Sequence, residues 1–389
     1  MRVFVVAGEP SGDRLGAALM AGLAQLCGDV EYHGVGGELM QAQGLDSLFD
    51  MSELSVMGIA EILPKYRQLK RRIAQTAAAV IDFSPDVLIT IDSPDFCLRV
   101  AALVKARSDI RIVHYVAPSV WAWRAGRAKK MARHVDQVLA LLPFEPPLMQ
   151  AAGMRCDFVG HPVVAEPQVS DAQVADFRAR HGLGAAPVVL ALPGSRKGEV
   201  SRLAPVFGAA LQKVLTAHPT ARVVVPAAPS VGALVAEQLT GWPGTPIVLD
   251  PRGIDPALAE AEKRAAFRVA DVALAASGTV SLELAAAQTP TVIAYDMNWI
   301  SWQIMSRMLR VNTVTLVNLV SGKNVVPEFL GPDCQPGPIA AALSKLLSGA
   351  KGPRAQRDAM ADTMTALGLG GDAPGLRAAR AVLDGLGTK

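Results

Sequence analysis

The sequence predicts an α/β protein with two doubly wound, Rossmann-like domains that face each other across a cleft. Apolar runs of strand length alternate with helix-like stretches along most of the 389 residues, which is typical of parallel sheets covered by helices. The alternation loosens around residues 160–185, where the chain becomes polar and rich in Pro, Gly and Ala. Since a domain takes roughly 100–200 residues, two domains fit the length, and we place their boundary near residue 165.

The order of these runs assigns elements to each half. The first half has strand-like runs at 2–7, 86–91, 110–116 and 135–142, and helical stretches at 13–26 and 94–106. The second half has strand-like runs at 187–192, 221–228, 246–250, 271–277 and 290–297, and helical stretches at 203–215, 231–239, 257–267 and 279–288. We expect domains at 1–165 and 166–345, and a helical segment at 346–389 that packs back on the N-terminal domain.

Composition narrows the class of protein. A net charge of +3 is too small for a nucleic-acid-binding protein, but it is compatible with an anionic substrate or lipid surface. The four cysteines form no CxxC pair, so we expect reduced thiols in a cytosolic protein. The N-terminal apolar run is too short for a signal peptide, and no window reaches ~18 apolar residues. Any membrane contact is therefore expected to be peripheral.

Polar residues gather where the predicted strands end. The first strand ends in GEPSGD, which contains Gly8, Glu9, Ser11, Gly12 and Asp13, and later strands end in DSPD (92–95), PGSR (193–196), SGT (277–279) and Asp296. Each turn alone is also typical of a helix N-cap. Ligands of doubly wound sheets bind outside the carboxyl ends of the strands, so the turns together predict a ligand cleft.

Three of these turns suit phosphate. GEPSGD offers close backbone approach and leads into a helix N-terminus. Gly194 and Ser195 have Arg196 and Lys197 beside them, and a cation there makes charge-assisted hydrogen bonds. The third turn, Ser277, Gly278 and Thr279, is followed by Glu283, which could accept hydrogen bonds from ribose hydroxyls. A first-turn acid that complements the helix dipole is an equally good interpretation of Glu283.

Familiar cofactor motifs are missing from the sequence. It has no GxGxxG with a downstream acid, no GxxxxGK[ST], no DxD and no HExxH or HxH, so we expect no bound NAD, no ATP P-loop and no metal. A sugar-nucleotide enzyme without a metal must neutralise its departing diphosphate with Arg, Lys and helix ends.

Asp92 and Asp95 are the candidate catalytic bases. Both follow the strand at 86–91, and Ser93-Pro94 is typical of an N-cap and first helical residue. The helix dipole would keep Asp95 ionised, so that it could accept a proton from an attacking hydroxyl. A plain capping acid is the alternative.

The segment 51–72 mixes apolar and basic residues. Its basic residues are Lys65, Arg67, Lys70, Arg71 and Arg72, and its apolar residues are Met57, Ile59, Ile62, Leu63, Tyr66 and Leu69. A helix with a core face and a solvated basic face explains this pattern. The alternative is a surface that docks on acyl chains or an anionic membrane.

Several motifs occur in an order and at spacings that together resemble the lipid-A-disaccharide synthase family. They are GEPSGD, IDSPDF, HYVAPSVWAWR, LPFE, FVGHP, LPGSR and ASGTVSLE. The resemblance runs from residue 3 to about residue 330.

The resemblance implies a GT-B glycosyltransferase of lipid A and lipopolysaccharide biosynthesis. Such an enzyme transfers 2,3-diacylglucosamine from its UDP derivative to 2,3-diacylglucosamine 1-phosphate. It forms a β-1,6-linked disaccharide 1-phosphate and UDP, inverts the anomeric centre and needs no metal. It lies on the cytoplasmic face of the inner membrane of a Gram-negative cell. A homodimer is left open.

The resemblance also assigns functional residues of the family to positions in this sequence. The important aspartate falls on Asp95, the key arginine on Arg196 and an asparagine on Asn318. UDP is expected at 277–279 and Glu283, and the acceptor on the N-terminal domain. Two positions depart from the family pattern: Ala117 stands where Ser is common, and Gly331 stands where Gln is expected.

Three other functions stay open from the sequence. The peptidoglycan glucosaminyltransferase shares the nucleotide domain, but it should show a GGTGGH-like loop in place of GEPSGD. A UDP-sugar epimerase would not need an acyl-docking surface. A non-catalytic binding protein would have no need to keep Asp95, Arg196 and Glu283 together.

Overall fold

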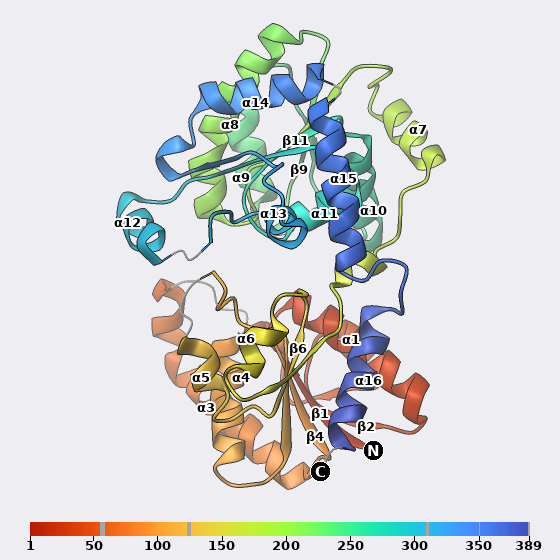
Figure 1. Ribbon diagram of the computed structural model, residues 1–389, viewed down its shortest axis with the longest axis vertical. Coiled ribbons are helices and arrows are strands. Elements are labelled where there is room, and N and C mark those ends of the chain that lie inside the picture. The colour runs from red at the N-terminus through yellow and green to blue at the C-terminus, as the bar shows by residue number, and fades with distance from the viewer. Residues whose placement is uncertain (55–58, 123–125, 309–310, 350, 388–389) are drawn as a thin grey trace. The chain divides into compact units, whose positions relative to one another are not determined.

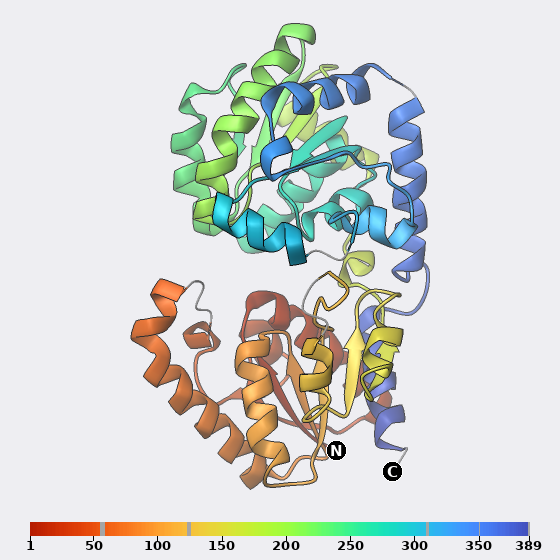
Figure 2. The same ribbon diagram turned by 60° about the vertical axis from the view of Figure 1, so that its left-hand side comes forward.

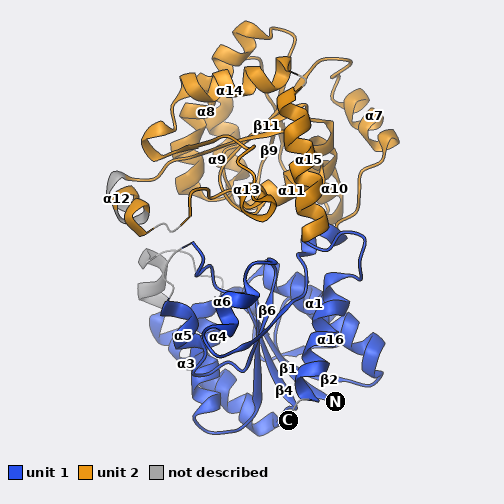
Figure 3. Cartoon of the chain, viewed as in Figure 1, with its two compact units in different colours: residues 1–165, 367–389 blue, residues 166–366 orange. Residues whose placement is uncertain are grey.

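The computed structural model describes residues 1–54, 59–122, 126–308, 311–349 and 351–387. The chain forms two compact units, shown in different colours in Figure 3. Unit 1 is Met1–Ala165 with Leu367–Lys389, and unit 2 is Glu166–Ala366. The expected C-terminal segment 346–389 is thus divided, because residues 346–366 belong to unit 2.

Unit 1 is built on a parallel sheet of seven strands in the order β3-β2-β1-β4-β5-β6-β7. The strands are β1 (Arg2–Ala7), β2 (Glu31–Val35), β3 (Asp46–Ser47), β4 (Val87–Ile91), β5 (Arg111–Tyr115), β6 (Gln137–Ala140) and β7 (Arg155–Phe158). The central strands β1 and β4 are buried almost throughout, as their continuous apolar sequences predict for a sheet covered on both faces.

Helices cover both faces of this sheet. One face carries α1 (Pro10–Cys27) and α16 (Pro374–Leu386), which lie side by side in Figure 1. The other face carries α3 (Ile59–Phe83) and α4 (Pro94–Lys105), and the turned view in Figure 2 shows them across the sheet from α16. The shorter helices are α2 (Glu38–Gln41), η1 (Met51–Leu54), α5 (Gly126–Met131), α6 (Pro146–Gln150) and η2 (Pro162–Ala165).

Small residues let α16 approach α1. A Cβ atom on Gly22 of α1 would lie 2.7 Å from the carbonyl oxygen of Gly375. The buried Gln137 side chain then donates a hydrogen bond to the carbonyl oxygen of Ala381, at 2.8 Å. The last helix is therefore part of the unit 1 core.

Unit 2 has a parallel sheet of six strands in the order β10-β9-β8-β11-β12-β13. The strands are β8 (Val188–Leu192), β9 (Arg222–Pro226), β10 (Ile247–Leu249), β11 (Val272–Ala275), β12 (Thr291–Tyr295) and β13 (Glu328–Leu330). Its helices are α7 (Asp171–Arg180), α8 (Lys197–Ala217), η3 (Pro229–Val231), α9 (Gly232–Gln238), η4 (Leu239–Gly241), α10 (Pro256–Val269), α11 (Val280–Ala286), α12 (Trp299–Met308), α13 (Leu316–Ser321), η5 (Gly331–Asp333), α14 (Pro336–Ser348) and α15 (Lys351–Ala366).

The order of the strands reverses direction at one point in each sheet, which is its topological switch point. In unit 1 it lies between β1 and β4, where Ala7 pairs with Ile91. In unit 2 it lies between β8 and β11, where Leu192 pairs with Ala275. Such switch points are where doubly wound sheets bind ligands. The motifs GEPSGD, DSPD and PGSR directly follow three of these strands, and SGT follows β11 after Ala276. The predicted fold class, α/β with two doubly wound Rossmann-like domains, is confirmed.

Candidate functional site

The GEPSGD loop of unit 1 is pressed against the turn after β4. A Cβ atom on Gly8 would lie 2.6 Å from the Ser93 Oγ atom, so only glycine fits there. Glu9 is the N-cap of α1 but makes no side-chain capping bond, and Pro10 opens the helix. Ser11 is exposed and Gly12 is buried. The switch point therefore presents a tight turn followed by the start of an 18-residue helix.

Asp13 serves the fold of this loop. It is buried, and its carboxylate accepts hydrogen bonds of 2.9 to 3.1 Å from the backbone N–H groups of Gly37, Leu39 and Met40. Its negative charge thereby caps the start of α2. Asp13 thus has a structural role inside unit 1, and an expected contact with substrate would have to share its carboxylate with these N–H groups.

The turn after β4 holds one of the candidate bases, Asp92, in an unusual backbone conformation. Asp92 and Ser93 have φ angles of 47° and 41°, in the left-handed region that non-glycine residues seldom adopt. Such conformations gather at functional sites. Burial raises the pKa of Asp92 above its ordinary value, whereas Asp95 is exposed in the first turn of α4. Both carboxyl groups lie at the same switch point, and they differ in exposure.

The PGSR turn of unit 2 is organised by Glu199. Its Oε2 atom accepts hydrogen bonds from the backbone N–H groups of Ser195, at 3.1 Å, and Arg196, at 3.3 Å. Its Oε1 atom pairs with the Arg196 guanidinium at 3.2 Å. Gly194 has a φ of 122°, and a Cβ atom there would lie 2.6 Å from the Glu199 Cβ atom. Glu199 is a site residue that we did not predict from the sequence, although its place one turn into α8 is that of an N3 capping acid.

Arg196 remains largely accessible despite this pair. Its side chain is 65% exposed, and Ser195 and Lys197 beside it are also exposed. The turn therefore presents a cationic group at the end of β8, where an anionic ligand could reach it.

The second turn at this switch point is small and open. Ser277 is half-buried, and Gly278 and Thr279 are exposed. Gly278 has a φ of 142°, and a Cβ atom there would meet nothing within 4 Å. Glu283 pairs with the Lys263 Nζ atom at 2.7 Å, so its expected contact with ribose hydroxyls would have to share the carboxylate with this lysine.

Asn318 is enclosed by its own chain. It is buried, and its amide nitrogen donates to the Thr313 Oγ1 atom and the Val326 carbonyl oxygen. Its Oδ1 atom accepts from the backbone N–H groups of Val325 and Val326. The family resemblance places Asn318 in the nucleotide-sugar site. In the structure Asn318 lies on α13, and these four bonds join that helix to Thr313 before it and to residues 325–326 after it.

Gly331 explains one departure from the family pattern. It has a φ of 54°, and a Cβ atom there would lie 2.5 Å from the Trp302 ring. A glutamine at this position would have to displace the indole. In this chain Trp302 occupies the space that the family residue would need.

The apolar and basic segment lies only partly within the described side chains. Met57 and the side chains of Ile59, Ile62 and Leu63 are outside them. On the described part of α3, Tyr66 is 51% exposed and Leu69 is half-buried. Arg67, Lys70 and Arg71 are exposed. Arg72 instead forms an ion pair with Glu53, at 2.5 Å, so it belongs to the fold.

The described residues contain neither a cluster suited to a metal ion nor a helix suited to span a membrane. Among them, no group of three or more His, Cys, Asp or Glu side chains is arranged to hold a metal ion. No helix in the described ranges has both the length and the apolar character that crossing a membrane requires.

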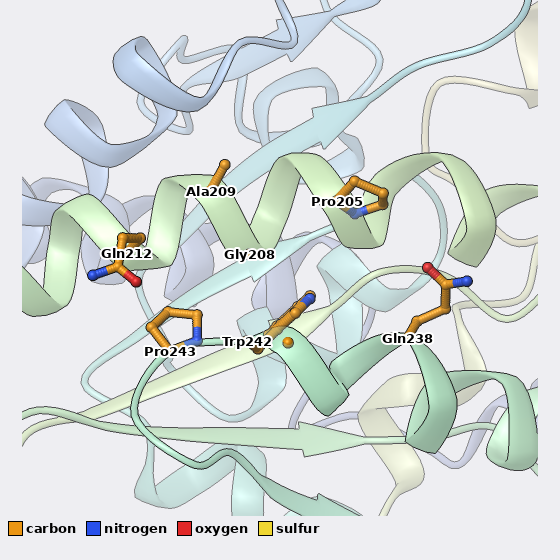
Figure 4. Close-up of a pocket in the computed structure, with 8 residues that line it drawn as sticks. Pro205, Gly208, Ala209, Gln212, Gln238, Trp242 and Pro243 are labelled. Carbon is orange, nitrogen blue, oxygen red and sulfur yellow. The ribbon is translucent and has the colours of Figure 1, made fainter.

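A further pocket lies away from the switch points. It has a volume of about 350 Å³ and lies between the middle of α8 and the η4 region. Figure 4 shows Pro205, Gly208 and Gln212 of α8 opposite Gln238 and Trp242. The expected site residues are absent from its lining. It is therefore distinct from the PGSR and SGT turns.

The family model described as lipid-A-disaccharide synthetase matches residues 3–370. The lipid-A-disaccharide synthase of Ruegeria pomeroyi is 65% identical over 386 residues, which cover 99% of this chain and 96% of that protein. The Rhodospirillum centenum lipid-A-disaccharide synthase is 46% identical over 388 residues, covering 98% and 94%. The chain belongs to the lipid-A-disaccharide synthase family. The predicted family and enzyme class, a glycosyltransferase of lipid A biosynthesis, are confirmed.

Solved structures with little sequence similarity share the fold. UDP-GlcNAc 2-epimerase from Neisseria meningitidis, bound to UDP-GlcNAc, has a TM-score of 0.65 at 14% identity and covers 100% of both chains. The Methanocaldococcus jannaschii UDP-GlcNAc 2-epimerase, in complex with UDP-GlcNAc and UDP, has a TM-score of 0.60 at 12% identity and covers 99% of both chains. These similarities establish the GT-B type of fold.

Proposed function

We propose that this chain transfers 2,3-diacylglucosamine from UDP-2,3-diacylglucosamine to the 6-hydroxyl of 2,3-diacylglucosamine 1-phosphate. The products are the β-1,6-linked disaccharide 1-phosphate and UDP. The observation that best supports this proposal is that the switch points of the two units carry groups of opposite charge. The point in unit 1 holds two carboxyl groups, and the point in unit 2 holds an accessible arginine between small residues.

Unit 2 is the proposed donor site. The Arg196 guanidinium at the N-terminus of α8 would meet the diphosphate of UDP, and Gly194 and Gly278 would allow close backbone approach. Two structures of the same fold hold UDP-GlcNAc, which supports a UDP-sugar here. As the glycosidic bond breaks, its electron pair moves to the UDP oxygen, and Arg196 with Lys197 would stabilise that charge. This arrangement assigns no role to a metal.

Unit 1 is the proposed acceptor site. A carboxylate at the β4 turn would take the proton of the 6-hydroxyl as its oxygen attacks the anomeric carbon from the side opposite UDP. The new C–O bond then forms as the old one breaks, and the configuration inverts. Asp95 is exposed and so accessible to substrate. Asp92 has a raised pKa, which makes it the stronger base when ionised.

The exposed part of α3 is the proposed contact with the membrane. Tyr66 offers an aromatic ring, and Arg67, Lys70 and Arg71 offer positive charge. Aromatic and basic side chains together bind anionic lipid surfaces without crossing them. This contact would hold the enzyme at the cytoplasmic face of the inner membrane, where both acylated substrates are embedded.

Mass spectrometry of the products tests the proposal. Donor and acceptor are incubated in detergent and EDTA with wild type, Asp95→Asn, Asp92→Asn and the control Asp82→Asn, an exposed residue of α3. We expect disaccharide and UDP from wild type and the control despite EDTA, and a loss of at least about 10²-fold in the variant that lacks the base. Absence of disaccharide from wild type would contradict the proposed function. Unchanged turnover in both aspartate variants would contradict the base assignment.

A further inference from the structure

Two motifs of unit 1, HYVAPSVWAWR and LPFE, meet at a buried carboxylate. Glu145 is 4% exposed. Its Oε1 atom accepts a hydrogen bond from the Trp121 Nε1–H group at 3.3 Å, and its Oε2 atom accepts one from the Leu142 backbone N–H group at 3.0 Å. Trp121 follows β5 and Leu142 follows β6, so this one side chain joins the loops at the carboxyl ends of two neighbouring strands.

We propose that Glu145 is a positioning residue, whose ionised carboxylate holds Trp121 and with it the loop after β5 in the conformation that glycosyl transfer requires. This inference rests on the proposed function, because it assumes that the reaction takes place at the turn after β4. Protonation of Glu145 would loosen the loop and slow the transfer. Glu145 itself has no contact with the reacting atoms in this account.

The start of the loop is tied directly to the candidate base. The Asp92 backbone N–H group donates a hydrogen bond to the Tyr115 carbonyl oxygen, at 2.9 Å. The next residue, Val116, has a φ of 85°, which is a strained conformation for a β-branched side chain. Its N–H group donates to the Leu139 carbonyl oxygen at 3.0 Å. Strain of this kind persists only where the surroundings hold it.

Glu145 fixes the other end of the same loop through its hydrogen bond with Trp121. Trp121 lies five residues beyond Val116, and its indole also packs edge-on against Phe144, with ring centroids 5.4 Å apart. Ala117 and Val120 are buried in the unit 1 core. The loop is thus fixed beside Asp92 at its start and by the Glu145 hydrogen bond near its end, so a change at Glu145 would be transmitted toward the β4 turn.

The surroundings of Glu145 favour a neutral carboxyl. Residues 117–122 and 137–144 and helix α6 carry no charged side chain. The Cys156 thiol faces Glu145 from β7, where Arg155 and Asp157 pair with each other. On α5, Lys129 and Lys130 are exposed and Arg127 is half-buried.

This burial sets the range in which Glu145 titrates. It raises the Glu145 pKa to about 7, against the opposing effect of the hydrogen bonds. Above that pH both oxygens accept hydrogen bonds. Below it one oxygen carries a proton and is a poorer acceptor for the N–H group that faces it, so one of the two bonds is weakened. The loop is therefore held most firmly above pH 7.

Tryptophan fluorescence tests the contact between Glu145 and Trp121 independently of activity. The difference in emission between wild type and Trp121→Phe, followed as a function of pH, reports on Trp121 and should show a transition near the Glu145 pKa of about 7. The transition should disappear when the same difference is taken in a Glu145→Gln background. The control Trp242→Phe alters an indole of unit 2. When the same difference is taken in a Trp242→Phe background, the transition should remain. A wild-type difference without the transition would overturn the proposal.

Turnover tests the positioning role. We expect kcat of wild type to rise with pH through about 7, and kcat of Glu145→Gln to be about tenfold lower and to lack that rise. Trp121→Phe should resemble Glu145→Gln, whereas Trp242→Phe should follow wild type. A Glu145→Gln enzyme with the wild-type pH profile would overturn the proposal. Wild type without any product would contradict the proposed function instead, and the fluorescence titration would still decide whether Glu145 titrates against Trp121.

Discussion

The two units share one strand order and place opposite chemistry at its centre. In both, the first strand of the unit lies beside its fourth, and the site motifs follow those two strands. In unit 1 the turns carry Asp92 and Asp95, with non-glycine residues in left-handed conformations. In unit 2 the turns carry Gly194, Gly278 and the exposed Arg196. The fold therefore determines where a ligand can bind, and the turn residues determine its charge.

The largest expected effect falls on the cationic turn. Arg196→Ala removes the group proposed to stabilise the departing diphosphate, so kcat/KM should fall about 10²–10³-fold. Arg268→Ala, an exposed arginine on α10, is the matched control and should leave kcat/KM unchanged. Steady-state kinetics with the UDP donor measures both. A drop of less than threefold in Arg196→Ala would remove Arg196 from the donor site.

Asp13 tests whether the GEPSGD loop depends on its internal carboxylate. Asp13→Ala leaves three backbone N–H groups without their acceptor and should lower the free energy of unfolding by about 2–4 kcal/mol. Asp29→Ala, at an exposed position just after α1, should cost less than about 0.5 kcal/mol. Urea unfolding of both variants gives the comparison. Equal stabilities would show that the cap on α2 contributes little.

The pH dependence of stability separates the buried groups of unit 1. Burial lowers the pKa values of His114 and His161 to about 4, so their stabilising effect is present above pH 6.5 and is lost as the pH falls toward 4. Glu145, whose pKa is raised to about 7, and Asp92, whose pKa burial also raises, act in the opposite direction as the pH falls. The two histidines therefore make wild type lose stability on acidification from pH 6.5 toward 4, and the two carboxyl groups reduce that loss.

Replacing one of the two histidines should reduce that loss. His114→Gln can still bond the Thr90 hydroxyl, which lies 2.8 Å from the ring in wild type. Between pH 7 and 5 its unfolding free energy should fall by about 2 kcal/mol less than that of wild type. Chemical unfolding followed by circular dichroism measures the difference. Parallel losses in the two proteins would mean that His114 does not resist protonation.

Two glycines of unit 2 give the smallest expected difference. Gly331 and Gly322 both have positive φ angles. A Cβ atom on Gly331 would collide with the Trp302 ring, whereas a Cβ atom on Gly322 would meet nothing within 4 Å. Gly322→Ala should cost about 1 kcal/mol from backbone strain alone. Gly331→Ala should cost about 1–3 kcal/mol more, because the indole has to move. Equal thermal shifts would show that Trp302 yields freely.

The sequence predicts the organisation of this protein better than the use of each side chain. Alternating apolar runs locate most strands, because strands of a covered parallel sheet are apolar along their length. The short strands β2, β3, β7 and β13 escape prediction, since all four carry charged residues at a sheet edge or next to it. Likewise, nothing in the residues of 346–389 marks where α15 leaves one unit and α16 joins the other.

Individual contacts lie beyond what motif spacing can predict. Asp13 and Asn318 both stand in motifs that resemble a binding site, yet each satisfies its hydrogen bonds within its own unit. Glu145 ends the LPFE motif and Glu199 stands at N3 of α8, but neither position names the partner of its carboxylate. Those partners are set by the turns after β5 and β8. Such partners depend on tertiary distances of a few ångströms, which a linear spacing does not contain.

Calorimetric titration of UDP into Arg196→Ala and Asp95→Asn tests the division of labour most directly. We predict that Asp95→Asn binds UDP as wild type does. We predict that Arg196→Ala loses at least about tenfold in UDP affinity. The opposite pattern, with UDP affinity lost in Asp95→Asn and kept in Arg196→Ala, would contradict the claim that unit 2 binds the nucleotide and unit 1 supplies the base.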